Sequence, residues 1–155
     1  MRVESANEGA EFLTFRLGDE EYAVDILQVR EIRANEPITH IAGAPSFVKG
    51  VINLRGTIVP IVDLRVKLGF DAPSGSPVVM ILSISGRVVG VMVDAVNDVM
   101  RLAAGEIRPA PEIAGAIGQR FIAGIAPVGD RMLVVVDMER LMAADELALV
   151  AREAA

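Results

Sequence analysis

GVINLRGTIVPIVDL, residues 50–64, and GIAPVGDRMLVVVDM, residues 124–138, have the same length, an opening glycine, a central turn and a closing Val-Asp. In each segment, apolar runs flank a turn, at Arg55-Gly56 in the first and at Gly129 to Arg131 in the second. Short apolar runs separated by a glycine turn predict two antiparallel strands joined as a hairpin. Two copies of one hairpin indicate an internal repeat. We therefore expect two similar β subdomains.

A second predicted hairpin precedes each copy along the chain. The predicted strands cover residues 12–17 and 22–25 in the first half, and 78–84 and 88–93 in the second half. Both upstream hairpins end their second strand in Val-Asp, at Asp25 and at Asp94. The repeat thus extends over most of the chain, and the protein is predicted to be mostly β.

The segment from Phe70 to Pro77 is rich in proline, serine and glycine and lies between the two halves, so we interpret it as a linker. We expect a first subdomain over about residues 11–72 and a second over about 77–137. Residues 1–10 lack an apolar pattern and are expected to form a disordered tail.

Helix is predicted in two places. Residues 63–68 are expected to form a short helix that Asp63 caps at its start and Gly69 ends. A C-terminal amphipathic helix is predicted over about residues 137–152. The apolar residues that indicate it are Leu141, Met142, Leu147 and Val150.

Composition excludes several classes of protein. The chain has 155 residues, enough for one domain or two small subdomains that share a core. Its net charge of -6 opposes binding to nucleic acid. No apolar stretch is long enough to span a membrane, and the first residues contain no secretory signal, so we expect a cytoplasmic protein.

The sequence offers little material for a catalytic or metal site. His40 is the one histidine and the chain has no cysteine, so neither a zinc site nor thiol catalysis is expected. Residues 43–50, GAPSFVKG, lack the spacing of a phosphate-binding loop. We therefore expect no cofactor, no metal and no enzymatic activity, which leaves a module that binds other proteins.

Five segments, in their order and spacing, carry a resemblance to a known family. They are EFLTFRLGDEEYAVDILQVREI, PSFVKGVINLRGTIVPIVDLRVKLG, GRVVGVMVDAVNDV, IRPAP and DRMLVVVDMERLM. The chain from about Glu11 to its C-terminal helix resembles CheW-type chemotaxis coupling proteins. The resemblance implies two SH3-like barrels of about five strands each, packed around a shared core.

The resemblance also implies a non-enzymatic adaptor in receptor arrays at the inner face of the membrane. Its expected partners are the regulatory domain of the histidine kinase CheA and the cytoplasmic tip of a chemoreceptor, and copies of the adaptor are expected to contact one another. The stretch of sequence contains neither a kinase nor a receiver domain, which favours a free coupling protein among the members of the family.

By matching segments, the resemblance implies a receptor-binding groove between the subdomains. The implied residues are Val29, Glu31, Arg55, Val78, Val89, Gly90 and Val96. Each has a simpler interpretation as well. Arg55 could be a solvated turn residue, Glu31 could pair with Arg30 or Arg33, and alternating valines in a strand are usually core. Gly90 would admit either a neighbouring strand or a receptor helix.

Two alternatives remain open from the sequence. The chain could be a paralogue that serves another signalling system, such as a surface-motility pathway, or a coupling domain related to CheV. It could also be a small hydrolase or a ligand-binding barrel. A deep polar pocket that contains His40 and a carboxylate would favour the hydrolase.

Overall fold

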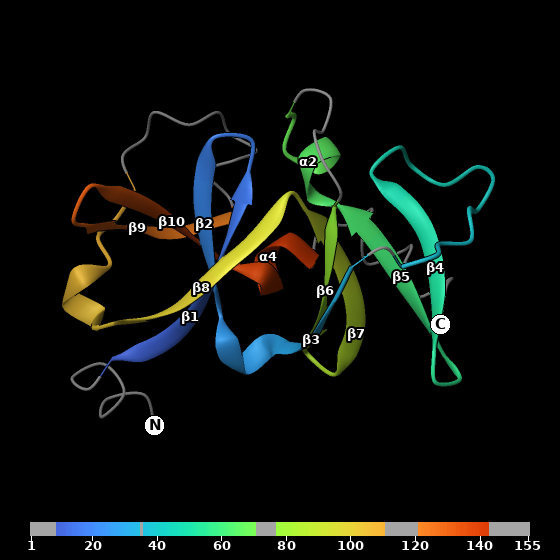
Figure 1. The fold of residues 1–155 in the computed structure, drawn as a ribbon, viewed down its shortest axis with the longest axis horizontal. Coiled ribbons are helices and arrows are strands. Elements are labelled where there is room, and N and C mark those ends of the chain that lie inside the picture. The colour runs from blue at the N-terminus through green and yellow to red at the C-terminus, as the bar shows by residue number, and fades with distance from the viewer. Residues whose placement is uncertain (1–8, 35, 71–76, 111–120, 143–155) are drawn as a thin grey trace.

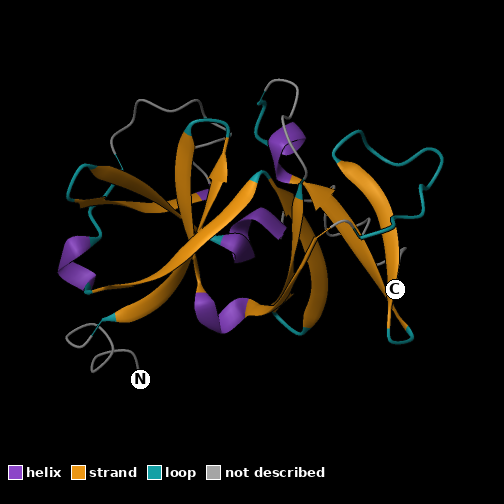
Figure 2. Ribbon diagram, viewed as in Figure 1, coloured by secondary structure: helices purple, strands orange, loops and turns teal. Residues whose placement is uncertain are grey.

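The computed structural model describes residues 9–34, 36–70, 77–110 and 121–142, and these form mostly β-strands (Figures 1 and 2). The strands make two five-stranded sheets that lie side by side, with α4 between them (Figure 1). The order across sheet A is β8 (Ala95–Leu102), β1 (Ala10–Leu17), β2 (Glu20–Asp25), β10 (Arg131–Val136) and β9 (Ile122–Val128). The order across sheet B is β3 (Val29–Ala34), β6 (Val78–Ile84), β7 (Arg87–Val93), β5 (Thr57–Asp63) and β4 (Val48–Leu54). The helices are η1 (Ile26–Gln28), α2 (Leu64–Lys67), η2 (Ala104–Glu106) and α4 (Met138–Met142).

All four predicted hairpins are confirmed. They are β1–β2, β4–β5, β6–β7 and β9–β10, and each pair is antiparallel. Both sheets are mixed, because β10 pairs with β2 and β5 pairs with β7 in the parallel direction. The prediction of a mostly β protein is therefore correct.

The two halves of the chain exchange strands between the sheets. Each half supplies a hairpin, a single strand and a second hairpin. Sheet A combines the first hairpin of the first half with the last three strands of the second half, and sheet B has the reverse composition. The predicted boundary between residues 72 and 77 therefore does not coincide with the division between the sheets. Hydrophobic alternation identifies a strand, but it does not identify the neighbour with which the strand pairs.

The expected SH3-like barrels are corrected to two five-stranded mixed sheets. Among the described residues, no ladder joins the outer strands β3 and β4, or β8 and β9. Instead, the chain after β3 makes a single bridge from Thr39 to Val51 in β4, and the chain after β8 makes a single bridge from Arg108 to Ile125 in β9. The bridges bring the opposite edges of each sheet together without a continuous ladder.

These bridges explain the opening glycine of each repeated segment. The backbone of Thr39 exchanges hydrogen bonds of 2.8 and 2.9 Å with that of Val51, directly after Gly50. A Cβ atom on Gly50 would lie 2.0 Å from the carbonyl oxygen of Thr39, and one on Gly124 would lie 2.8 Å from that of Arg108. Glycine is needed at both positions because another backbone approaches closely.

The closing aspartates of the repeat begin the helices. The prediction of a helix over 63–68 is confirmed by α2, in which the Asp63 carboxylate accepts a hydrogen bond of 3.0 Å from the backbone N–H of Arg65. Asp137 accepts in the same way, at 3.1 Å, from the N–H of Arg140 in α4. The backbone N–H groups of Asp63 and Asp137 donate to the carbonyls of Phe47 and Phe121, so the repeat also holds in its hydrogen bonds.

Three sequence predictions fall wholly or partly outside the described residues. The C-terminal helix predicted over 137–152 is described only as α4, Met138–Met142, so no long helix is present in the described part of the chain. Residues 71–76 of the predicted linker and residues 1–8 of the predicted tail also lie outside it. Residue 10, placed in the tail, is instead the first residue of β1 and pairs with Leu102.

A shared hydrophobic core lies between the sheets. It includes Leu17 and Tyr22 from sheet A, Met80 and Val91 from sheet B, and Leu141 from α4. Each sheet also has a smaller apolar cluster of its own. Burial of aliphatic and aromatic area across this junction is the main force that holds the two sheets together.

Replacing Gly56 with valine is expected to destabilise the protein by about 1–2 kcal/mol. Gly56 has a positive φ of 91°, and no atom beyond the adjoining residues lies within 4 Å of the position of a Cβ, so the cost arises from the backbone alone. Chemical unfolding measures it. Gly105→Val is the control, because Gly105 also faces open space but has no positive φ. Equal stability of the two variants would contradict the assignment.

Candidate functional site

Glu31 and Arg55, two of the seven candidate residues, form an ion pair. Arg55 Nη2 lies 2.6 Å from Glu31 Oε2, and Arg33 Nη1 lies 2.9 Å from the other carboxylate oxygen. Arg55 is at the turn between β4 and β5, with a φ of 52°, whereas Glu31 is in β3 on the opposite edge of sheet B. The pair therefore joins the two edges of the sheet, and it remains open to solvent, since the Arg55 side chain is 67% exposed.

The Arg55 guanidinium holds the pKa of Glu31 below its usual value through this hydrogen bond, with a further contribution from Arg33. A carboxylate whose pKa is lowered by folding adds stability above its unfolded pKa of about 4.3 and loses it as the pH falls through the lowered value. The ion pair of Glu31 and Arg55 therefore stabilises the fold at neutral pH, and this stabilisation is lost in acid as Glu31 becomes protonated.

The Arg55→Gln variant is expected to raise the pKa of Glu31 towards the ordinary value, because the largest hydrogen-bond contribution is removed. NMR titration of the Glu31 carboxyl carbon measures this shift. Arg140→Gln serves as the control, since Arg140 pairs with Asp137 at a distance of 3.5 Å rather than with Glu31. An unchanged Glu31 titration in Arg55→Gln would show that the pair does not form in solution.

The four candidate valines pack against the core between the sheets. Val89 is 5% exposed and belongs to this core, while Val29, Val78 and Val96 are partly buried and contact it. Val29 and Val78 lie in sheet B and Val96 lies in sheet A. The half-buried valines therefore lie where the two sheets meet, and Val89 contributes to packing.

Gly90 is buried, and the neighbour that requires glycine there is a side chain of the adjacent strand. A Cβ on Gly90 would lie 2.4 Å from Cδ1 of Ile61 and 3.1 Å from Cγ1 of Val79. Ile61 in β5 is directly opposite Gly90 in β7. The neighbouring strands β5 and β6 therefore account for the close approach at Gly90.

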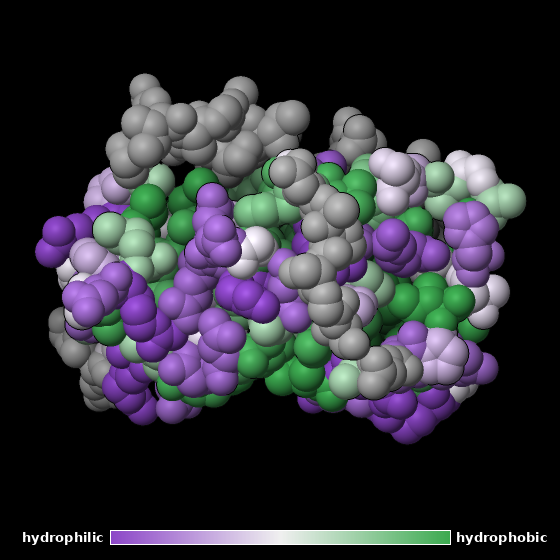
Figure 3. Space-filling model, turned by 45° about the horizontal axis from the view of Figure 1, so that its top comes forward, coloured by the Kyte–Doolittle hydropathy of each residue, from purple (hydrophilic) through white to green (hydrophobic). Residues whose placement is uncertain are grey.

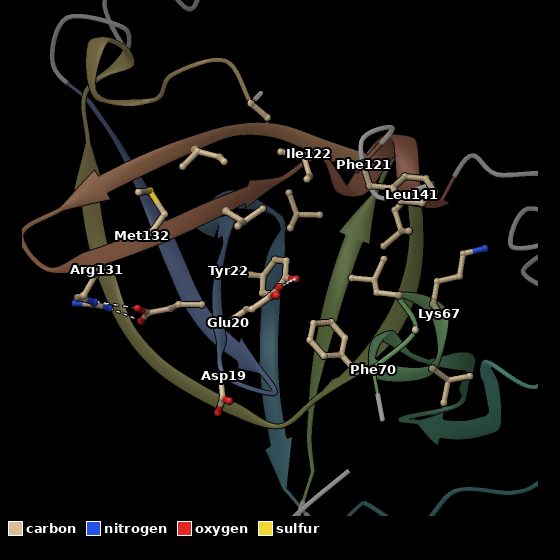
Figure 4. A pocket seen from close by; sticks show the side chains of 18 of the residues that line it. Asp19, Glu20, Tyr22, Lys67, Phe70, Phe121, Ile122, Arg131, Met132 and Leu141 are labelled. Atoms are coloured by element: carbon tan, nitrogen blue, oxygen red, sulfur yellow. Dashed lines mark hydrogen bonds and ion pairs between the residues drawn. The ribbon is translucent and has the colours of Figure 1, made fainter. Parts of the chain in front are cut away.

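A groove of about 1150 Å³ is a feature that sequence reasoning missed. Figure 4 shows Tyr22 and Phe70 facing each other in it, with Phe121, Ile122 and Leu141 nearby. The rings of Tyr22 and Phe70 make an edge contact with centroids 6.4 Å apart. The residues that line the groove come from β2, β9, β10, α2, α4 and the loops beside them, so no local pattern in the sequence would have indicated the groove.

One end of the groove carries an ion-pair network. Arg131, labelled at this end of the groove in Figure 4, binds Glu21 through Nε at 3.0 Å. It also binds Asp98 through Nη2 at 3.2 Å. The hydrogen bond from Arg131 lowers the pKa of Glu21. The pKa of Asp98 is lowered mainly by a hydrogen bond from the Thr14 hydroxyl and further by Arg131. On the face of the molecule drawn in Figure 3, hydrophobic surface lies near the middle and hydrophilic surface lies on either side of it.

The positions of His40 and of the acidic residues bear on the catalytic and metal-binding alternatives. His40 is exposed and does not line the groove, so the hydrolase alternative gains no support. Within the described ranges, no three His, Cys, Asp or Glu residues are grouped to hold a metal ion. The helices of those same ranges include none that is long and apolar enough to cross a membrane.

Comparison with known proteins agrees with the resemblance. The model of the CheW-like domain matches residues 11–146. The chemotaxis protein CheW of Klebsiella aerogenes is 51% identical over 92% of this chain and 87% of its own length, and that of Rhizobium meliloti is 40% identical over 90% and 92%. The crystal structure of the scaffolding protein TtCheW from Thermoanaerobacter tengcongensis is similar with a TM-score of 0.81 and 32% identity, over 89% of this chain and 95% of that one.

Proposed function

This chain belongs to the CheW family of chemotaxis coupling proteins, and we propose that it joins the histidine kinase CheA to the cytoplasmic tips of chemoreceptors. Coupling is a scaffolding task, and members of the family are adaptors rather than enzymes. In this proposal the chain works on the cytoplasmic side of the membrane, held there by the receptor array.

The observation that best supports a receptor-binding face is the exposed pair of Glu31 and Arg55. Arg55 projects from a turn, and its guanidinium can bind a carboxylate or a helix-terminal carbonyl of a partner while it still contacts Glu31. Val29, Val78 and Val96 add half-buried apolar surface where the sheets meet. A helix with an apolar stripe and acidic residues is a suitable partner for such a combination.

The kinase is proposed to bind a second surface, through pairing of one end of this protein with the corresponding end of the CheA regulatory domain. Use of two separate faces produces contacts that propagate until they close into a ring or lattice. Weak individual contacts, including those between copies of this chain, would then gain strength from multivalency.

A binding experiment with two purified fragments tests the proposal. The protein is expected to retain both a chemoreceptor cytoplasmic fragment and the regulatory region of CheA, and to raise receptor-dependent kinase activity in reconstituted arrays. Binding to neither fragment would contradict the proposal. Binding only to receptors and kinases of a surface-motility system would instead support the alternative pathway.

A further inference from the structure

Three buried charges meet at the end of β5 and β7, in what we name the Arg65 cluster: Asp63, Arg65 and Asp94. Arg65 binds both carboxylate oxygens of Asp63, through Nε at 2.9 Å and Nη2 at 3.0 Å. Its Nη1 lies 3.1 Å from Asp94 Oδ1. These three side chains are only 4%, 1% and 6% exposed for Arg65, Asp63 and Asp94.

The Arg65 cluster is a demanding arrangement to bury. Two carboxylates face one guanidinium, and Lys49 Nζ, 3.7 Å from Asp63, supplies the second positive charge at the surface. Buried ion pairs often contribute little net stability, because the cost of desolvating the charges offsets their attraction. Removal of one partner is nevertheless destabilising, because it leaves the other charge buried and unpaired. Such a cluster is therefore better explained by the geometry that it enforces than by the energy that it adds.

Asp94 connects the two sheets. It lies between β7 of sheet B and β8 of sheet A, and its second carboxylate oxygen accepts a hydrogen bond of 2.7 Å from the N–H of Gly18 in the β1–β2 turn. The N–H of Asp94 donates to the carbonyl of Arg16. One carboxylate thus holds sheet A through Gly18 and sheet B through Arg65, the second residue of α2, which follows β5 directly.

The repeat shows that this contact is not a general property of the fold. Asp25 is the counterpart of Asp94 at the end of the upstream hairpin, but it only caps η1 by accepting from Leu27. Glu139 corresponds to Arg65, two residues after the closing aspartate, and it is exposed. Only one of the two equivalent junctions therefore carries the buried charges.

We propose that Asp94 and Arg65 are positioning residues that fix the angle between the two sheets. The inference rests on the proposed function in one respect: the half-buried valines of the receptor-binding face come from both sheets, so the angle sets their spacing. Val96 lies two residues after Asp94 in sheet A, and Val29 lies in sheet B. A change in the angle would separate them without any change at the face itself.

Distance measurement between spin labels tests the proposal in the full chain. The natural sequence has no cysteine, so cysteines introduced at Val99 in sheet A and Ile58 in sheet B, both exposed, can be labelled specifically. Asp94→Asn keeps the size of the side chain but has one acceptor oxygen for two donors, so either Gly18 or Arg65 loses its partner. The distance distribution is expected to broaden, and binding to the receptor fragment to weaken roughly tenfold.

Arg65→Lys is the second variant, because lysine cannot hold Asp63 and Asp94 at once with a planar fork, and it decides the result if Asp94→Asn does not fold. Asp25→Asn is the control, since asparagine caps a helix as well as aspartate does, and its distances should match those of the parent. Parental distances in both folded cluster variants would overturn the proposal. Broadened distances with unchanged receptor binding would overturn the positioning role. If the parent does not bind receptor, the proposed function fails, while the distances still decide whether the cluster holds the sheets.

Discussion

Gly50→Ala is expected to lower the free energy of unfolding by about 3 kcal/mol or more, enough to reduce the melting temperature by roughly 10 °C. Gly50 has a φ of 145°, and its added Cβ would overlap the carbonyl oxygen of Thr39 at 2.0 Å. A backbone oxygen cannot rotate away as a side chain can. Relief therefore requires the Thr39–Val51 bridge to open, which releases the edge of sheet B.

Two further glycine variants separate the sources of this cost. Gly86 has a φ of 80° but open space around it, so Gly86→Ala reports backbone strain alone, about 1 kcal/mol. Gly124→Ala is expected to cost an intermediate amount of stability. Its added Cβ would lie 2.8 Å from the carbonyl oxygen of Arg108, but the backbone of Gly124 has no positive φ. Unfolding in denaturant should rank the losses Gly50, Gly124, Gly86. A loss at Gly50 no larger than that at Gly86 would show that the bridge is not formed in solution.

Arg55→Glu is expected to weaken binding to a chemoreceptor fragment at least about tenfold while it leaves the fold nearly as stable as before. The Arg55 side chain is 67% exposed, and solvent screens an exposed ion pair, so the loss of this pair costs little stability. At the proposed receptor face, however, the new carboxylate stands beside Glu31 and repels the acidic groups of a partner. Thermal unfolding and receptor-stimulated kinase activity, measured together, separate the two effects.

The charge-swapped variant Arg55→Glu with Glu31→Arg distinguishes direct contact between Arg55 and the receptor from a role of the ion pair in holding the β4–β5 turn. The swap restores an ion pair between β3 and the β4–β5 turn but moves the guanidinium to the other strand. If Arg55 touches the receptor, the swap stays impaired. Full recovery would mean that the pair only holds the turn in place. Unchanged coupling in the single Arg55→Glu variant would remove this residue from the proposed site altogether.

Much of the fold was predictable from local patterns. The four hairpins follow from period-two alternation of apolar residues and from glycine turns, and both are properties of neighbouring residues. The start of α2 follows from the ability of Asp63 to accept a hydrogen bond from a backbone N–H two residues later. The family, and with it the coupling function, follows from segments whose order and spacing extend along nearly the whole chain.

The candidate site was predictable in its charged part and less so in its apolar part. Arg55 had to be at a turn because of Gly56, but its contact with Glu31 joins strands at opposite edges of a sheet. For the valines, alternation shows that one face of a strand is apolar. It does not show whether that face meets the core, as Val89 does, or remains half open, as Val96 does.

Sequence was therefore sufficient for the elements, their turns, the repeat and the family, because short-range backbone geometry and side-chain alternation control them. Three features were visible only in the tertiary structure. They are the exchange of strands between the halves, the backbone bridges beside Gly50 and Gly124, and the Arg65 cluster. Each depends on contacts between residues far apart in sequence, such as Gly18 and Asp94. Which of several equivalent strands and charges become neighbours is settled by how whole sheets pack, and no local pattern carries that information.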